Sequence, residues 1–285
     1  MTERPAADLP TERPAADLPT DLPPLPTDLP TDLPPLPTLG PVTRRPPSTG
    51  ARRAWEPAVV LDVRAETPTA RTLRLGLPAG AQGHVPGQHY VVRVPGPDGA
   101  PAQRSYSVAS APRAPGPDGL REIELTIERL DGGAVSPYLH DVVQVGDRLE
   151  VRGPFGGWFI WSGDTPVLLV GGGSGVVPLM AMVRHWRLGG RRMPLHLVLS
   201  VRTPQEVYYR DELGPETTVV HTRRAPPGDP RPAGRLVAAD LLPLLVPGAT
   251  CYVCGSAGFA EHASQLLVTC GVDRGLVRVE RFGPS

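Results

Sequence analysis

The hydrophobic pattern of this chain changes near residue 163, and this change constrains the fold more than any other feature. Before that point apolar and polar residues alternate, as in 121–130, which is the period of a strand with one buried face. After it, continuous apolar runs such as PVLLV at 166–170 alternate with helical patterns. Continuous apolar strands are typical of a parallel sheet that helices cover on both faces. The sequence therefore predicts a β domain followed by an α/β domain.

The β domain is expected to span residues 53–162 and to form a closed, six-stranded antiparallel barrel. Proline- and glycine-rich turns separate its strand-like runs, and six strands within about a hundred residues suit a small barrel. One helix is expected near 136–139, with Ser136 as its N-cap and Pro137 as its first residue. The predicted strands are 58–65, 70–77, 88–95, 103–110, 121–130 and 147–154.

The α/β domain is expected to span residues 163–285 and to contain a parallel sheet. Alternating strands and helices of this kind are typical of dinucleotide-binding domains. Its strands are predicted at 166–170, 195–201, 218–222, 250–255 and 276–280. Its helices are predicted at 176–188, 206–213, 235–245 and 258–270.

Residues 1–52 are expected to be a disordered tail outside both domains. The segment TERPAADLP occurs at 2–10 and again at 11–19, and related TDLPPLP segments follow through Pro37. Proline at this density removes backbone donors and disfavours both helix and sheet. A proline-binding partner could dock here, although a repeat expansion without function is the simpler interpretation.

Composition excludes several classes of function. The formal net charge is zero, so electrostatics favour neither nucleic acid nor an anionic membrane as a partner. All 29 cationic residues are arginine, which excludes lysine chemistry such as a Schiff base. Three cysteines are too few for a disulfide framework or for an iron–sulfur cluster, and we assign no metal-binding residue. Without a long apolar run or a signal-peptide pattern, we expect a cytoplasmic monomer.

Two short segments combine residues that suit cofactor chemistry. Residues 104–107 (Arg-Ser-Tyr-Ser) place a phosphate-pairing cation, a flat aromatic ring and two hydroxyls on one predicted strand. Residues 171–175 (Gly-Gly-Gly-Ser-Gly) lie between a buried strand and an apolar helix, where glycine lets backbone N–H groups approach a pyrophosphate. The loop departs from the G-x-G-x-x-G fingerprint, because Val176 stands at the position of the third glycine.

Four segments, in this order, resemble the ferredoxin–NADP(+) reductase-type flavoproteins, especially the reductase components of bacterial oxygenase systems. They are RSYS at 104–107, GGGSG at 171–175, CGSAGF at 254–259 and ERF at 280–282. The resemblance implies that the barrel binds FAD, that the α/β domain binds NADPH or NADH, and that hydride passes to flavin N5. With no fused iron–sulfur domain expected, electrons would continue to a separate acceptor, such as a ferredoxin-type protein or an oxygenase.

The resemblance also assigns flavin contacts. Arg104 would pair with the flavin phosphate, a task that suits its planar fork of donors. Tyr106 would lie against the isoalloxazine ring, and Ser107 would hydrogen-bond N5. A helix start at 133–136 would meet the diphosphate, which favours FAD over FMN, although an ordinary helix cap is the alternative. The remaining flavin contacts would be Ser105, Gly133, Val135, Ser136 and Phe282.

The nucleotide site is expected at the glycine loop and at the strand around Cys254, which would contact the nicotinamide. After strand 195–201 comes Arg202, with no acid until Glu206, so Arg202 and Ser200 could bind a 2′-phosphate. This favours NADPH, although a solvated surface arginine is the alternative. The predicted nucleotide contacts are Gly171, Gly173, Ser174, Gly175, Ser200, Arg202, Cys254 and Gly255.

Three residues are predicted to act in catalysis: Ser107, Cys254 and Glu280, the last by assisting proton movement. Phe282 would cover the flavin face that the nicotinamide must occupy, although the chain continues for three residues beyond it. Three alternatives stay open. The chain could reduce free flavin or quinone, bind flavin without turnover as a regulatory module, or act as an adaptor through its proline-rich segment.

Overall fold

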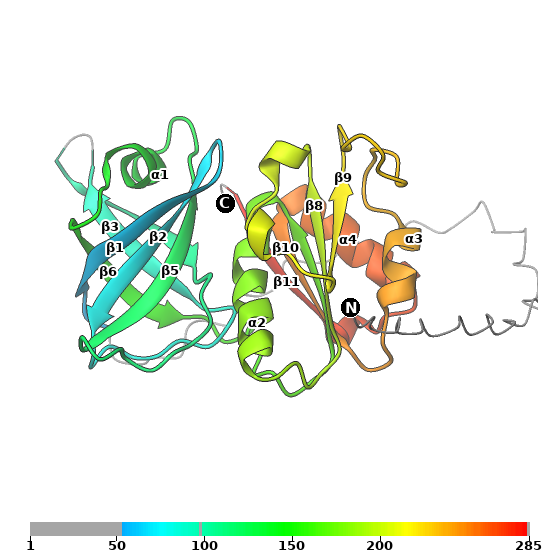
Figure 1. Cartoon of the computed structure of the whole chain (residues 1–285), viewed down its shortest axis with the longest axis horizontal. Coiled ribbons are helices and arrows are strands. Elements are labelled where there is room, and N and C mark those ends of the chain that lie inside the picture. The colour runs from blue at the N-terminus through cyan, green and yellow to red at the C-terminus, as the bar shows by residue number, and fades with distance from the viewer. Residues whose placement is uncertain (1–52, 97–98, 284–285) are drawn as a thin grey trace, which may run out of the picture. The chain divides into compact units, whose positions relative to one another are not determined.

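The computed structural model describes residues 53–96 and 99–283, and its first half is an antiparallel sheet that closes into a barrel (Figure 1). The order of its six strands is β4-β3-β6-β1-β2-β5. Val108, just after β4, forms a bridge with Leu125 of β5, and the N–H of Ala109 donates to the carbonyl of Glu124 at 2.8 Å. The strands are β1 (Glu56–Thr67), β2 (Ala70–Pro78), β3 (His89–Pro95), β4 (Pro101–Ser107), β5 (Leu120–Glu128) and β6 (Arg148–Phe155).

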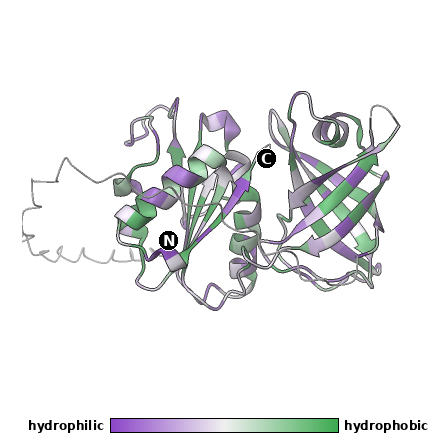
Figure 2. Cartoon of the chain, turned by 180° about the vertical axis from the view of Figure 1, so that it is seen from behind, coloured by the Kyte–Doolittle hydropathy of each residue, from purple (hydrophilic) through white to green (hydrophobic). Residues whose placement is uncertain are grey.

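The predicted barrel and each of its predicted strands are confirmed. The alternation in 121–130 places Ile123, Leu125 and Ile127 in the barrel core, where all three are fully buried. Burial of side chains of this size contributes roughly 1.5–3 kcal/mol each. Figure 2 shows hydrophobic and hydrophilic segments alternating along the barrel strands. The proline-rich residues 1–52, predicted to be disordered, lie outside the described residues.

The helix between β5 and β6 exists, but its predicted cap is wrong. The helix α1 (Val135–Pro137) has Ala134 as its N-cap and continues into a π turn, η1 (Tyr138–Val142). Ser136 therefore lies inside the helix, and its hydroxyl accepts a hydrogen bond from the N–H of Leu130 at 3.1 Å. Pro137 consequently ends α1 instead of starting it.

The second half is a five-stranded parallel sheet of order β11-β10-β7-β8-β9, in which every strand pair is parallel. Along β7, Val167 and Leu169 pack on the face covered by α2, and Leu168 and Val170 on the face covered by α4. This two-sided burial explains the continuous apolar run. The strands are β7 (Val167–Gly172), β8 (Leu195–Val201), β9 (Thr217–His221), β10 (Thr250–Ser256) and β11 (Val277–Phe282), and the longer helices are α2 (Val176–Leu188) and α4 (Ala257–Thr269).

The helix predicted at 206–213 is absent. The chain there forms two 3₁₀ turns, η3 (Pro204–Glu206) and η4 (Arg210–Glu212), on either side of Tyr209, which has φ 52°. The N–H of Tyr209 donates to the Glu66 carboxylate of the barrel at 3.2 Å, and not to a carbonyl one helical turn earlier. A long-range contact therefore overrides the local helical pattern.

The helix predicted at 235–245 is shorter than expected. Only α3 (Ala238–Leu241) is α-helical, and a 3₁₀ turn, η5 (Leu242–Leu244), follows. Pro243 lies in that turn and has no N–H to continue the helix.

The barrel and the parallel sheet together belong to one compact unit. In the ranges that the structure describes, no helix has the length and apolar character needed to cross a membrane.

Candidate functional site

The carboxyl edge of the parallel sheet brings together the residues predicted to bind a nucleotide. Cys254 of β10 lies between Gly171 of β7 and Glu280 of β11 in the strand register. On the other side of β7, Ser200 of β8 pairs with Gly172. Parallel strands end at the same edge of a sheet, which is where open α/β sheets bind their ligands.

The glycine loop at this edge packs closely on one side and is open on the other. A Cβ at Gly175 would lie 2.1 Å from the carbonyl oxygen of Cys254, so this residue must be glycine for the loop to contact β10. A Cβ at Gly172 would lie 2.6 Å from the ring of Phe259. Gly173, by contrast, has φ +54°, and no described atom lies within 4 Å of its Cβ position.

The start of α2 adds backbone donors to this open space. The loop becomes a 3₁₀ turn, η2 (Gly173–Gly175), which leads directly into α2. The first turn of α2 carries no acidic residue and no side-chain cap, so its N–H groups and helix dipole remain available to an anion. An open glycine beside a free helix N-terminus fits the pyrophosphate of a dinucleotide.

Cys254, which is fully buried, and Glu280, which is half-buried, are titratable groups paired on adjacent strands. Burial, with a smaller contribution from Glu280, raises the pKa of the Cys254 thiol well above its usual range. Burial also raises the pKa of Glu280 to about 7. One oxygen of the Glu280 carboxylate is buried and has no hydrogen-bond partner among the described residues. A carboxyl group with this pKa can hold or release a proton near neutral pH.

The barrel strand β4 carries a second incomplete set of polar groups. Arg104 and Ser105 are exposed, Tyr106 is half-buried against the barrel core, and Ser107 is buried. The Tyr106 hydroxyl is buried without a hydrogen-bond partner in the described part of the chain, and burial raises its pKa. No described residue forms an ion pair with Arg104. A free guanidinium and an unpartnered phenol on one strand fit a phosphate-bearing aromatic ligand such as a flavin.

The second predicted flavin segment lies beside the first. The short helix α1 contacts β4, so the residues at 133–136 are neighbours of the strand that carries Tyr106. Gly133 is exposed, whereas Val135 and Ser136 are buried. The helix α1 continues into η1, so the helical segment after Gly133 spans residues 135–142.

The backbones of three arginines meet where β8 ends, and the sequence analysis recognised only Arg202. Arg202 is exposed and forms an ion pair with Glu206, with an N–O distance of 2.6 Å. The backbone N–H groups of Arg223 and Arg224, which follow β9, donate to the carbonyl of Arg202 at 2.9 and 3.1 Å. Their proximity follows from the parallel pairing of β8 and β9, and no local sequence pattern links them to Arg202.

Two residues near the carboxyl edge complete the description of the site. Phe282 is half-buried and packs against the apolar cluster on the α2 side of the sheet. Ser256, which the sequence analysis did not single out, is the N-cap of α4, and its hydroxyl accepts a hydrogen bond from the N–H of Phe259 at 3.4 Å. A serine immediately before the first residue of a helical pattern is the signal that identifies such a cap.

Comparison with known proteins agrees with this geometry. Residues 58–160 match the model of the oxidoreductase FAD-binding domain, and residues 169–265 match that of the oxidoreductase NAD-binding domain. The chain is 31% identical, over 193 residues, to the ferredoxin–NAD(P)(+) reductase component of naphthalene 1,2-dioxygenase/salicylate 5-hydroxylase systems from Ralstonia sp. That alignment covers 64% of this chain and 56% of the relative. The chain belongs to the ferredoxin–NADP(+) reductase-type flavoproteins.

Two other proteins match most of this chain. The reductase component of propane 2-monooxygenase from Rhodococcus jostii is 29% identical over 219 residues, which is 72% of this chain and 57% of the relative. A cytochrome P450 reductase from Amycolatopsis has a TM-score of 0.66 at 26% identity, with 81% of this chain and 70% of that chain covered.

The fold is also that of the FAD/NAD-binding domain of nitric oxide dioxygenase from Vibrio cholerae. Its TM-score is 0.71 at 23% identity, and the match covers 82% of this chain and 100% of that domain. The chain spans 57%, 53% and 52% of the length of three curated relatives that it matches.

Proposed function

We propose that this chain is an FAD-dependent oxidoreductase that takes hydride from NADPH and passes electrons to a separate acceptor. The observation that carries the proposal is the presence, in one compact unit, of two incomplete sites. One is β4, with its free Arg104 and its unpartnered Tyr106 hydroxyl. The other is the carboxyl edge of the parallel sheet, with its open Gly173 and its unpartnered Glu280 carboxylate.

Residues of the barrel would hold the flavin. When bound, FAD would accept a hydride at N5 and pass its two electrons onward. Arg104 would bind the phosphate through its guanidinium, and Tyr106 would lie against the ring system with its hydroxyl paired by the ligand. Ser107 would hydrogen-bond the ring near N5. The backbone around Gly133, together with Ser105, Val135 and Ser136, would contact the diphosphate region, which favours FAD over FMN.

Residues of the α/β domain would hold the nicotinamide nucleotide. Gly171, Gly173, Ser174 and Gly175 would bind its pyrophosphate through backbone N–H groups at the start of α2. The nicotinamide would lie near Cys254, a neutral and fully buried thiol, where Gly255 permits close approach.

Glu280 and Phe282 would complete the reaction site from β11. Glu280, with its pKa raised to about 7, would hold or move a proton at its carboxyl oxygen. Phe282 would exclude water from the flavin face until the nicotinamide replaces it.

The arginines at the end of β8 support NADPH as the preferred donor. Backbone hydrogen bonds bring Arg202, Arg223 and Arg224 to this edge, and Arg210 follows in η4. Cations in this position would bind a 2′-phosphate, in place of the acidic residue that commonly binds an unphosphorylated ribose. Because Arg202 forms an ion pair with Glu206, binding of the phosphate would require that pair to open.

A separate protein is the proposed electron acceptor. The relatives from Rhodococcus jostii and Ralstonia sp are named as reductase components of oxygenase systems. By analogy, the acceptor of this chain would be a ferredoxin-type protein or an oxygenase component. A physical link between the two would be transient, as expected for redox encounters.

The decisive experiment is an anaerobic titration of the purified chain. The bound flavin is first released and identified, and the holoprotein is then titrated with NADPH and, separately, with NADH. We expect FAD, bleaching of the visible flavin absorbance by either nucleotide, and a lower KM for NADPH. Absence of bleaching with both nucleotides would leave a flavin-binding module without turnover. Rapid reoxidation by free flavin or quinone, but not by ferredoxin-type proteins, would contradict the proposed protein acceptor.

A further inference from the structure

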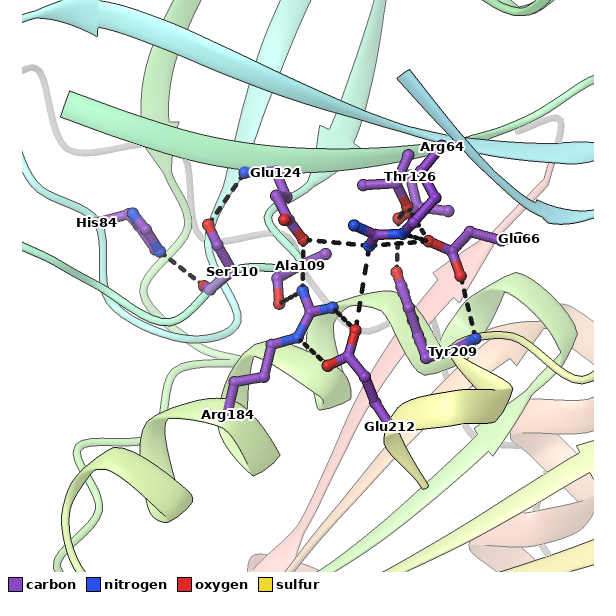
Figure 3. Close-up of polar contacts among 11 residues, drawn as sticks. Arg64, Glu66, His84, Ala109, Ser110, Glu124, Thr126, Arg184, Tyr209 and Glu212 are labelled. Atoms are coloured by element: carbon purple, nitrogen blue, oxygen red, sulfur yellow. Dashed lines mark hydrogen bonds and ion pairs between the residues drawn. The ribbon is translucent and has the colours of Figure 1, made fainter. Parts of the chain in front are cut away.

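A buried polar network joins the barrel to the α/β domain (Figure 3). At its centre is Arg184 of α2, whose side chain is 14% exposed. One nitrogen, Nη1, donates to Glu124 of β5 at 2.7 Å and to the carbonyl of Ala109 at 3.0 Å. Another, Nε, donates to Glu212 at 2.9 Å. Arg184 thus holds one acidic side chain from each domain.

The contact with Ala109 connects Arg184 to the predicted flavin strand. Ala109 is two residues beyond Ser107, and the bridge at Val108 that closes the barrel lies between them. The guanidinium of Arg184 therefore fixes the backbone at the end of β4. Arg184 is itself on the helix that begins at the glycine loop, so one side chain connects both predicted cofactor segments.

Tyr209 makes the second link between the two domains. Its hydroxyl pairs with that of Thr126 on β5 at 2.5 Å, and its N–H donates to Glu66 of β1 at 3.2 Å. The hydroxyl of Thr72 donates to Glu66 at 2.7 Å and pairs with that of Thr126 at 2.7 Å, which closes a ring of hydrogen bonds. The guanidinium of Arg184 also lies over the ring of Tyr209, with 5.0 Å between its Cζ atom and the centroid of that ring.

The backbone of Tyr209 is strained. Its φ of 52° is in the left-handed region, which bulky residues rarely adopt. Strain of this kind persists where the surrounding structure determines it, and it concentrates at functional sites. Here the carboxylate of Glu66 and the hydroxyl of Thr126 hold the two ends of the residue in the barrel.

We propose that Arg184 and Tyr209 are positioning residues that set the distance between the flavin and the nicotinamide. They connect the strand that ends at Ser107 to the helix and the loop of the nucleotide domain. Neither residue needs to touch the reacting atoms. The inference rests on the proposed hydride transfer, and it assigns the geometry of that step to a clamp formed by Arg184, Glu124, Glu212, Tyr209 and Thr126.

The test compares Arg184→Gln and Tyr209→Phe with two matched controls in the full chain. Arg231→Gln breaks an ion pair with Asp240 that lies entirely within the α/β domain. Tyr90→Phe removes a buried hydroxyl that donates to Gln82 within the barrel at 3.2 Å. Each control thus removes the same kind of interaction without touching the contact between domains.

The measured quantities are the rate of flavin reduction at saturating NADPH, its isotope effect with deuterated NADPH, the Kd for NADP(+), the flavin content and the Tm. Misplacement of reacting groups by about 1 Å can cost about a hundredfold in rate. We expect both clamp variants to transfer hydride about tenfold to a hundredfold more slowly, with a larger isotope effect and unchanged Kd and flavin content. In both controls the Tm should decrease by a similar amount, and the rate of flavin reduction should stay at the wild-type value.

Four results would overturn the proposal, and each has its own signature. If the wild type is reduced rapidly and Tyr209→Phe and Arg184→Gln are reduced equally fast, the clamp does not position the cofactors. The same conclusion follows if flavin reduction in the clamp variants is slowed only in proportion to their lost flavin content. It also follows if the controls, with a similar decrease in Tm, are slowed as much as the clamp variants. If neither NADPH nor NADH reduces the wild type, the proposed function itself fails and the positioning role falls with it.

Discussion

Gly173 offers a direct test of the proposed nucleotide site, because the structure separates the effect of a methyl group on folding from its effect on binding. At Gly173, φ is +54° and no described atom lies within 4 Å of the Cβ position. Gly190, in the loop after α2, has φ +80° and the same open surroundings. Substitution by alanine therefore costs only the left-handed backbone penalty, about 1–2 kcal/mol at either position.

The two variants should differ in nucleotide binding. In Gly173→Ala the methyl group enters the space that the pyrophosphate must occupy, and one charge-assisted hydrogen bond from the backbone is lost or lengthened. Such a bond contributes about 1.5–3 kcal/mol, so Kd should rise about 10- to 100-fold. In Gly190→Ala the methyl group lies at the opposite end of α2 from the glycine loop, and Kd should not change.

The assay has two parts. Thermal or denaturant unfolding measures the free energy of unfolding of each variant, which we expect to fall by a similar amount in both. Titration of the flavin-loaded protein with NADP(+) measures Kd, and the flavin content serves as a check that the barrel is intact. The reasoning is refuted if Gly173→Ala binds NADP(+) as tightly as the wild type, or if Gly190→Ala weakens binding equally.

Three further variants probe the other predicted roles. Arg104→Ala should weaken flavin binding by on the order of 1.5–3 kcal/mol, measured by flavin release on dilution. The control Arg74→Ala, at another arginine of the barrel, should leave flavin binding unchanged. A wild-type flavin affinity in Arg104→Ala would contradict the phosphate role. Arg202→Ala should raise the KM for NADPH far more than that for NADH, and equal increases would contradict a 2′-phosphate contact. Glu280→Gln should flatten the pH dependence of unfolding between about pH 4.5 and 7. Burial raises the folded pKa of Glu280 from 4.5 to about 7, so the folded state binds more protons in that window and the wild type loses stability as pH rises, by up to roughly 3 kcal/mol. Parallel pH profiles of the variant and the wild type would contradict this assignment.

The sequence by itself determined the strands and the two longer helices. Alternation around Ile123 identified a half-buried strand, and the continuous run at 166–170 identified a strand buried on both faces. These patterns are local, because the period of hydrophobic residues follows directly from strand geometry. Once the second sheet is known to be parallel, the ends of its strands must meet, which brings Cys254 beside Glu280.

The tertiary structure decided what depends on contacts between distant residues. The pattern at 206–213 is helical, yet Glu66 of the barrel holds Tyr209 in a left-handed conformation and prevents the helix. Ser136 matches an N-cap by its neighbours, yet Ala134 caps the helix and the Ser136 hydroxyl bonds Leu130 instead.

The residues of the candidate site divide in the same way. Arg104 and Gly173 are recognisable within a few neighbouring positions. The arginines at 223 and 224 and the clamp at Arg184 are not. Each of these depends on how a strand or helix packs against another element. Contacts between elements that are distant in the sequence leave no periodic pattern of hydrophobic residues by which they could be recognised.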